Sequence, residues 1–424
     1  MRIIPVLLIL VFLGSTTVQA GKKLRVLFVG NSYTYVNNMP QIAANIAAGM
    51  GDTLEWQMEA PGGATFMQHW GSNAQTLAKI AQGNWDYMVL QEQSQTPALP
   101  DGQVQMSMYP YAKKLDSFFR VHNPCGQSMY YMTWGRKNGD AANCTFYTNN
   151  YGWPYYCSYQ QMDSIIRVRY ETMASNNQGQ VAAVGAVWRY LRGNNPAIEL
   201  YDADESHPSL AGSYAAACSF YSALFKANPN QITVNAGLSA TDANAIKAAV
   251  KAVVFDSIPE WHIGAYRTEA LFSTMGSQSS MTFVNLSMNA VSADWDFGDG
   301  QTSTLSTPIH SFSTPGVYIV RLVATATNGC TDTAYTRLDF ATAGIDDLED
   351  SHFATVPNPS SGMFSINVPG EPALVIVRDI TGRTVWQRKG SGVLQADLCD
   401  QPKGMYLVQI VSEQRSLTLK HLIR

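Results

Sequence analysis

Short apolar runs alternate with helical segments through the first half of the chain, and this alternation constrains the fold more than any other feature. The run 24–29 is a continuous apolar strand, as strands buried on both faces should be, and further strands are expected at 54–59, 87–90, 128–133 and 180–187. Helical segments follow these runs: 39–50, 74–82, 106–122, 159–176, 210–226 and 241–254. Repeated βα units predict a parallel sheet with helices on both faces, because crossover connections place helices there.

The first of these strands ends abruptly in Gly30-Asn31-Ser32. Such a turn places the Ser32 hydroxyl at the carboxyl end of a strand, where open α/β sheets bind ligands. Far downstream, Asp204 and His207 stand three residues apart, just before a helical segment. A serine hydroxyl becomes a good nucleophile when a base removes its proton and a third group orients that base. Ser32, His207 and Asp204 can fill these three roles.

Each of these residues also has an ordinary structural interpretation. Ser32 suits a turn or the start of a helix, and Asp204 suits the acidic beginning of one. His207 precedes Pro208 and could simply lie at the surface. Their combination after strand-like segments, in this order, favours the catalytic interpretation.

The motifs together resemble the SGNH/GDSL hydrolase superfamily, over roughly residues 24–261. The usual Gly-Asp-Ser reads Gly-Asn-Ser here, and the second block corresponds to Gly62-Gly63. The resemblance implies a flavodoxin-like parallel sheet, the triad Ser32–His207–Asp204, and an oxyanion hole. Its donors would be the N–H groups of Ser32 and Gly63 (or Gly62). Gln93 stands where the third block usually has asparagine, which is a departure from the family pattern. Its side-chain amide would be the third donor.

Two further segments resemble a secreted branch of this superfamily: Leu90-Gln91-Glu92-Gln93-Ser94 and Met132-Thr133-Trp134-Gly135-Arg136. The resemblance implies a serine esterase for short acyl groups, especially acetyl esters on polysaccharides, that needs no cofactor or metal. Candidate substrate-binding residues are Asn31, Trp134 and Arg136. Trp153 and Trp188 could also line a sugar cleft, although tryptophan is equally a core residue.

Two alternatives remain open. One is a lipase or phospholipase of the same superfamily. The other is a catalytically inactive surface protein that binds glycans or acts in adhesion, which the altered third block favours. Nucleic acid is not an expected partner, because a net charge of −4 and a charged fraction of 14% provide no basic face.

The ends of the chain predict export. Residues 1–20 have the charged start, apolar run and small-residue end of a signal peptide, and no other segment is long and apolar enough to span a membrane. We expect the catalytic domain at 21–262. Residues 268–342 then resemble an Ig-like PKD domain. The resemblance lies in the motif Trp295-Asp296-Phe297-Gly298-Asp299-Gly300.

A linker is expected at 343–352, before a β-rich segment at 353–424. This segment opens with Pro357-Asn358-Pro359 and contains Gly404-Met405-Tyr406. It resembles the C-terminal sorting domain of the type IX secretion system of Bacteroidota. The resemblance implies the type IX machinery as a partner and a secreted or cell-surface protein, which we expect to be a monomer. A small carbohydrate-binding β domain is the alternative.

The chain has six cysteines, and an oxidising compartment would allow disulfides. We expect a bridge between Cys144 and Cys157, because it would staple the aperiodic segment 143–159. Cys218 lies in an apolar helical segment and is expected to be a buried free thiol.

Overall fold

The structure is a computed structural model that describes residues 21–340, 355–379, 383–411 and 416–424. The expected signal peptide and linker lie outside these residues. The chain divides into two compact units, residues 1–339 and 340–424. The first unit holds both the parallel sheet and the β-rich region that follows it.

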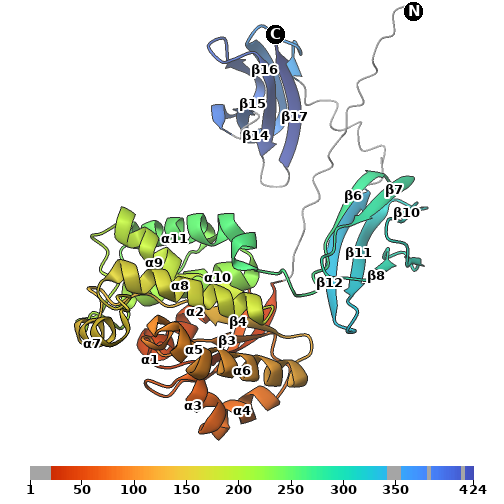
Figure 1. Cartoon of the computed structure of the whole chain (residues 1–424). Coiled ribbons are helices and arrows are strands. Elements are labelled where there is room, and N and C mark those ends of the chain that lie inside the picture. The colour runs from red at the N-terminus through yellow and green to blue at the C-terminus, as the bar shows by residue number, and fades with distance from the viewer. Residues whose placement is uncertain (1–20, 341–354, 380–382, 412–415) are drawn as a thin grey trace, which may run out of the picture. The chain divides into compact units, whose positions relative to one another are not determined.

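A five-stranded parallel sheet forms the centre of the first unit (Figure 1), in the order β2-β1-β3-β4-β5. This is the flavodoxin-like order. The strands are β1 (Lys23–Val29), β2 (Thr53–Glu59), β3 (Tyr87–Leu90), β4 (Gln127–Tyr131) and β5 (Gln180–Ala182). Every residue of β3, β4 and β5 is buried. The predicted α/β fold is therefore confirmed.

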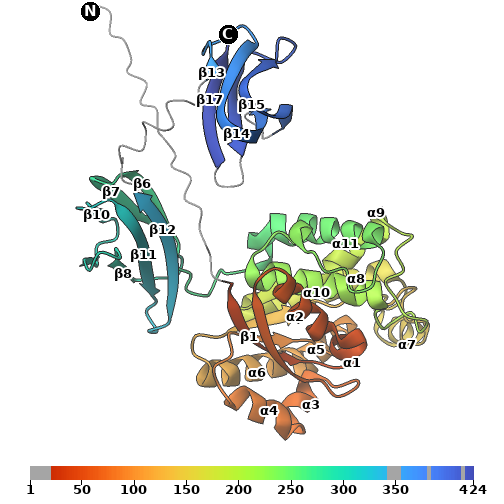
Figure 2. The ribbon, with the colours of Figure 1, turned by 180° about the vertical axis from the view of Figure 1, so that it is seen from behind.

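Helices cover both faces of this sheet, as Figures 1 and 2 show. On one side α2 (Met39–Gly49) packs against α10 (Leu210–Phe225), which in turn contacts α11 (Ala240–Val253). Another group comprises α4 (Ala74–Ala81), α6 (Tyr109–His122) and α8 (Tyr159–Asn176), with α6 contacting both others. This double cover explains why the central strand β3 is apolar and buried throughout.

Three sequence-based elements need correction. The expected strand 180–187 ends at Ala182, and α9 (Val184–Asn194) follows directly. A short apolar run fits a buried strand and a buried helix equally well, so periodicity could not separate them. The expected helix 106–122 is divided between α5 (Asp101–Ser107) and α6, with Pro110 in the first turn of α6. The segment 143–159, expected to be aperiodic, contains most of α7 (Ala141–Tyr151).

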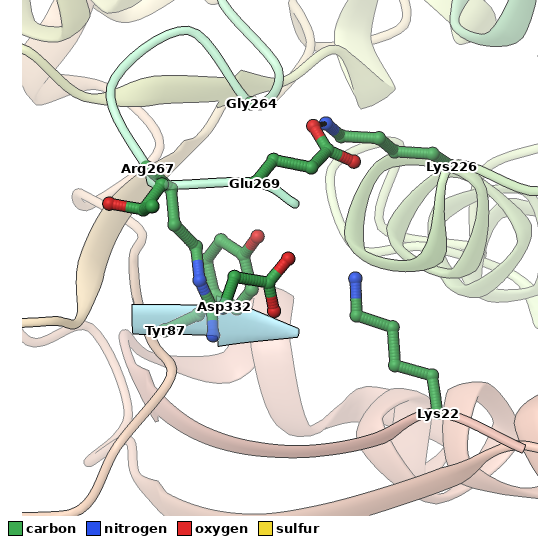
Figure 3. Close-up of a pocket in the computed structure, with 8 residues that line it drawn as sticks. Lys22, Tyr87, Lys226, Gly264, Arg267, Glu269 and Asp332 are labelled. Carbon is green, nitrogen blue, oxygen red and sulfur yellow. Dashed lines mark hydrogen bonds and ion pairs between the residues drawn. The ribbon is translucent and has the colours of Figure 1, made fainter. Parts of the chain in front are cut away.

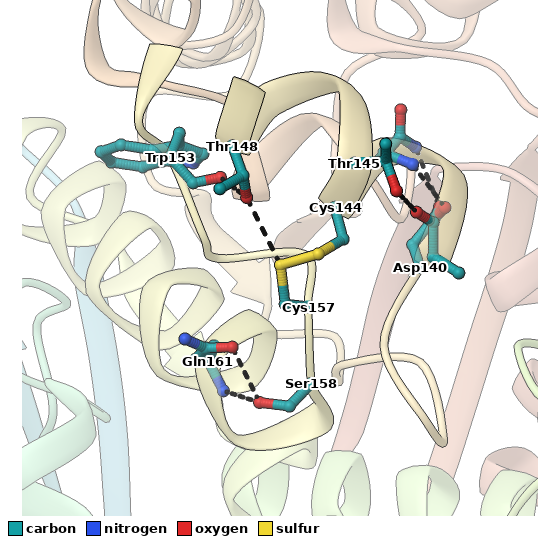
Figure 4. Close-up of a disulfide and its surroundings, with 10 residues drawn as sticks. Asp140, Cys144, Thr145, Thr148, Trp153, Cys157, Ser158 and Gln161 are labelled. Carbon is teal, nitrogen blue, oxygen red and sulfur yellow. Dashed lines mark hydrogen bonds between the residues drawn. A yellow bond between two sulfur atoms is a disulfide. The ribbon is translucent and has the colours of Figure 1, made fainter. Parts of the chain in front are cut away.

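None of the residues of α7 is buried, and a disulfide staples the helix to the chain that follows (Figure 4). The expected Cys144–Cys157 bridge is present, and Cys218 is a buried free thiol, also as expected. The Tyr156 hydroxyl donates to the carbonyl of Gln95 at 2.7 Å. The indole N–H of Trp153 donates to the carbonyl of Ala98 at 2.8 Å. The stapled insertion therefore packs on the segment that follows β3.

Two antiparallel sheets make up the β-rich part of the first unit, with orders β10-β7-β6 and β12-β11-β8-β9. Trp295 and Phe297 are buried and pack on Phe283, whereas Asp296 between them is partly exposed. This confirms the predicted alternation. The strands are β6 (Phe272–Ser277), β7 (Ser280–Asn285), β8 (Ser292–Asp296), β9 (Thr302–Ser303), β10 (Ile309–His310), β11 (Gly316–Thr325) and β12 (Thr331–Phe340).

A second disulfide, Cys125–Cys330, joins the α/β part to the β-rich part of the first unit. Arg267 also forms an ion pair with Asp86 at 2.7 Å, and Lys226 forms one with Glu269. Figure 3 shows a pocket beside these charges, lined in part by Lys22, Tyr87 and Asp332. Asp86 directly precedes β3, so these contacts lie at the amino ends of the strands, away from Ser32.

The second unit is an antiparallel sheet in the order β13-β14-β16-β17, with β15 paired to β14. Its core includes Phe364, Val375 and Val408. The strands are β13 (Thr355–Val356), β14 (Met363–Asp379), β15 (Thr384–Asp397), β16 (Gly404–Val411) and β17 (Ser416–Ile423). Throughout the described parts of both units, every helix is too short or too polar to cross a membrane.

Candidate active site

Ser32 begins the short helix α1 (Ser32–Tyr35) at the carboxyl end of β1. Asn31 caps this helix, and its Oδ1 accepts a hydrogen bond from the N–H of Tyr33 at 3.2 Å. A Cβ at Gly30 would lie 2.4 Å from Thr34 Oγ1 and 2.7 Å from Gln91 Oε1. Glycine is therefore required at this position, because any side chain would displace the groups that hold the turn.

The structure brings Ser32, His207 and Asp204 together in the predicted order. His207 Nε2 lies 2.8 Å from Ser32 Oγ, and His207 Nδ1 hydrogen-bonds to Asp204 Oδ2. The other carboxylate oxygen of Asp204 accepts from the N–H groups of His207 at 2.8 Å and Ser206 at 3.0 Å. Partial burial would raise the pKa of Asp204, but these hydrogen bonds outweigh it and lower that pKa. The carboxylate is therefore ionised and can orient the imidazole.

Buried aromatic side chains hold the loop that carries His207. The Tyr33 hydroxyl lies 2.6 Å from Ser206 Oγ, and the Trp134 indole N–H donates to the Ser206 carbonyl at 3.1 Å. The ring of Trp134 stacks on Tyr33 and on Trp188, with centroid distances of 4.8 and 3.7 Å. The prediction that Trp134 contacts substrate needs correction, because this side chain is 0% exposed. Trp188 is equally buried, so neither residue lines a cleft.

Asn31 also differs from the role predicted for it. The residue is only 2% exposed, and its Nδ2 donates to the carbonyl of Ala64 at 2.9 Å. Its backbone N–H donates to Gln91 Oε1 at 2.9 Å. Asn31 is therefore occupied in joining the Ser32 turn to the Gly62-Gly63 segment. The usual aspartate of the Gly-Asp-Ser motif could not donate the bond to Ala64 when ionised, because a carboxylate only accepts.

Gly63 lies where the second motif block was predicted, in a turn closed by the Ala64 N–H donating to Pro61 at 3.1 Å. Its φ of +69° is in the left-handed region, which glycine adopts without strain. Among the described residues, no acceptor is found for the N–H groups of Ser32 and Gly63. These two donors are therefore free to bind an oxygen atom.

Gln93 is held by its own loop. Its Oε1 accepts from the N–H groups of Gln95 at 2.8 Å and Thr96 at 3.1 Å, and its Nε2 donates to Gln95 Oε1 at 3.1 Å. Because an amide nitrogen carries two hydrogens, this leaves one available. Gln95 in turn donates to Asp140, which pairs with Arg136 at 2.9 Å. The partly exposed Arg136 thus belongs to the same polar network as Gln93.

Sequence reasoning missed two buried residues behind the site. Glu92 is completely buried, and its carboxyl group accepts from the N–H groups of Phe66 at 3.1 Å and Gln93 at 2.7 Å. His69 is also completely buried, with Nε2 at 2.8 Å from the Gly30 carbonyl oxygen and Nδ1 at 2.7 Å from Thr76 Oγ1. Glu92 lies in the Leu90–Ser94 segment quoted above and His69 lies in none of the motifs, but for both residues only burial and contacts reveal a role.

Glu92 should give the stability of the protein a measurable pH dependence. Burial raises its pKa to about 8 from an ordinary value of 4.5. Between these values the folded protein binds more protons at this site than the unfolded chain, so stability falls as pH rises. We expect Glu92→Gln to lose this decline, measured as urea midpoints at about pH 5.5 and about pH 9. Burial lowers the pKa of His69, and this makes stability rise with pH. Because His69 contributes equally to both proteins, the pH dependence of the variant is compared with that of the wild type. Equal pH dependence in both proteins would contradict the expectation.

Family models match the two β-rich regions. Residues 265–339 match the PKD domain, and residues 355–424 match a secretion system C-terminal sorting domain. The chain therefore carries both modules, as the sequence predicted. The sorting domain indicates export by the type IX machinery to a secreted or cell-surface location.

The chain is also similar to several characterised or solved proteins. A DUF4886 family protein from Bacteroides uniformis is 18% identical, with a TM-score of 0.47, over 56% of this chain and 95% of that one. The psychrotrophic esterase EstA from Pseudoalteromonas is 10% identical, with a TM-score of 0.34, over 48% of this chain and 97% of that one. A microbial collagenase from Vibrio alginolyticus is 33% identical over 96 residues, which are 23% of this chain but only 11% of the collagenase.

Proposed function

We propose that the protein is an exported serine esterase that hydrolyses carboxylic esters through an acyl-enzyme. The observation that carries this proposal is the hydrogen-bonded series Ser32–His207–Asp204, with 2.8 Å between Ser32 Oγ and His207 Nε2. A serine paired with an imidazole that an ionised carboxylate orients is equipped for nucleophilic attack. The site is also open, since His207 and Asp204 are partly exposed.

In the proposed reaction, His207 Nε2 removes the proton of Ser32 as Oγ attacks the ester carbonyl. Asp204 stabilises the imidazolium and fixes the tautomer with hydrogen on Nδ1. The imidazolium then donates its proton to the leaving alkoxide, which departs as an alcohol. A water molecule attacks the acyl-enzyme with the same base, releasing the acid and restoring Ser32.

The negative oxygen that forms during attack needs donors that are already in place. We assign this role to the free N–H groups of Ser32 and Gly63, with one Nε2 hydrogen of Gln93 as a third donor. Such donors act mainly in the transition state, where charge has developed on the oxygen.

For the substrate we propose short acyl esters, in particular acetyl groups on carbohydrate. Support comes from the sequence resemblance to a secreted branch and from the sorting domain, which places the protein outside the cell. The test is hydrolysis of p-nitrophenyl acetate, butyrate and palmitate, and acetate release from acetylated xylan. Preference for palmitate would favour a lipase, and no hydrolysis at all would favour the non-catalytic surface protein.

Gln93→Ala distinguishes an oxyanion donor from a substrate-binding residue. We expect kcat to fall by about 10²-fold with little change in KM, because the contact strengthens as charge develops. Steady-state kinetics on p-nitrophenyl acetate measure this split, with Gln75→Ala on the exposed surface of α4 as a control. If only KM rises, Gln93 positions the substrate instead.

A further inference from the structure

The proposed oxyanion hole draws its three donors from three separate segments. Ser32 follows β1, Gly63 follows β2, and Gln93 follows β3. Stabilisation of a developing oxyanion requires these donors to be fixed before the reaction, since a donor that must move contributes less. The buried groups that connect the three segments therefore determine how well the hole can work.

Glu92 connects two of these segments directly. Its carboxyl oxygens accept from the N–H of Phe66, at 3.1 and 3.2 Å, and from the N–H of Gln93 at 2.7 Å. Phe66 begins α3 (Phe66–Gly71), two residues after the end of the Pro61–Ala64 turn that contains Gly63. The backbone N–H of Glu92 itself donates to the Tyr170 hydroxyl at 3.1 Å, which anchors the residue to α8.

Fold stability does not account for a glutamate at this position. The residue is 0% exposed, and none of the ion pairs among the described residues involves it. Ionising a buried carboxyl group that has no cationic partner costs stability, as the raised pKa of Glu92 shows, whereas a side chain that cannot ionise would not carry this cost. The carboxyl group has two oxygens that can accept hydrogen bonds from several N–H groups at once. When the carboxyl group is ionised, these hydrogen bonds are charge-assisted and therefore stronger.

Two other buried side chains complete the connections. Asn31 joins the Ser32 turn to Ala64, and Gln91 Oε1 accepts from the Asn31 N–H and from Thr34 Oγ1, both at 2.9 Å. The contact between Ser32 and His207 depends on the Asn31 cap and on the Ser206 loop, and Glu92 touches neither. Loss of Glu92 would therefore loosen Gly63 and Gln93 while the nucleophile and base stay paired.

We propose that Glu92 is a positioning residue that fixes the Gly63 and Gln93 donors relative to each other and so sets the geometry of the oxyanion hole. The expected effect of Glu92 on catalysis rests on the proposed esterase function. The link that Glu92 makes between the Phe66 and Gln93 amides, here called the clamp, does not depend on that function.

The kinetic test uses Glu92→Ala and Glu92→Gln in the otherwise intact protein, with the exposed Glu55→Ala as a control. Reactive sites are first counted by titration with a fluorophosphonate, so that unfolded protein does not enter the comparison. For Glu92→Ala we expect kcat per titrated site on p-nitrophenyl acetate to fall about tenfold or more, with KM within about twofold. Glu92→Gln should recover part of kcat, because its single amide oxygen still accepts. A kcat per site equal to wild type in both variants would overturn the proposal.

A second measurement separates this inference from the esterase proposal. Amide hydrogen exchange at Phe66 and Gln93 should be slow in the wild type and faster in Glu92→Ala, whereas exchange in β4 should not change. If the alanine variant does not fold, Glu92→Gln carries the same comparison. Unchanged exchange at both amides would refute the clamp. If exchange accelerates but the wild type hydrolyses no ester, the esterase function fails and the clamp stands.

Discussion

Ser32→Ala is expected to lower the hydrolysis of p-nitrophenyl acetate by about three to six orders of magnitude, with the fold unchanged. The change removes the Ser32 hydroxyl oxygen, which lies 2.8 Å from His207 Nε2 and is the atom to which the acyl group would transfer. His207→Ala should be nearly as damaging, since the hydroxyl then has no base. Residues that act as one unit do not contribute additively, so the double variant should be little worse than either single one.

The matched control is Ser72→Ala, which removes an exposed serine hydroxyl at the end of α3. Circular dichroism and thermal unfolding should show that all variants are folded. A folded Ser32→Ala protein that retains near wild-type turnover would exclude the acyl-enzyme mechanism.

The second large effect concerns export. Removal of residues 353–424 in the native host should leave the protein in the periplasm, because the sorting domain at 355–424 is what the secretion machinery recognises. We expect near-complete loss of the protein from the cell surface and the medium, measured by immunoblots of cell fractions. We expect recognition to act on a folded β surface, since this unit is an antiparallel sheet with its own buried core.

The control for this experiment is full-length Ser32→Ala, which should be exported normally because its sorting domain is intact. Fusion of residues 353–424 to an unrelated periplasmic protein should carry that protein out of the cell. Normal delivery of the shortened chain would show that the segment is an additional β domain, and a glycan-binding role would then gain support.

Much of the α/β fold follows from the sequence, because buried strands such as β3 are apolar and amphipathic helices show their period. β3 and α8 are found at the bounds that the pattern predicts. The pattern fails at α9, which is short, follows β5 directly and is buried along most of its length. Its first residues, 184–188, are all buried and largely apolar, and its polar residues come only after them, so the run 180–187 shows no helical period.

In the candidate site, too, the sequence reveals some residues and not others. Ser32, Asp204 and His207 could be found because their residue types and order point to one chemistry. Trp134 was misjudged, because a sequence does not show whether an aromatic ring lies in a cleft or in the core. Glu92 and the Cys125–Cys330 pair were missed for a related reason. The two cysteines are 205 residues apart, and Phe66, which donates to Glu92, also lies far from it in the chain, so no local pattern shows either contact.

Covalent labelling tests the central claim most directly. The full chain is treated with a fluorophosphonate, digested, and analysed by mass spectrometry for the phosphonylated residue. The proposed mechanism predicts a single adduct on Ser32, which is absent from Ser32→Ala and formed much more slowly in His207→Ala. No adduct on the folded wild type, or an adduct on a different serine, would contradict the assignment of Ser32 as the nucleophile.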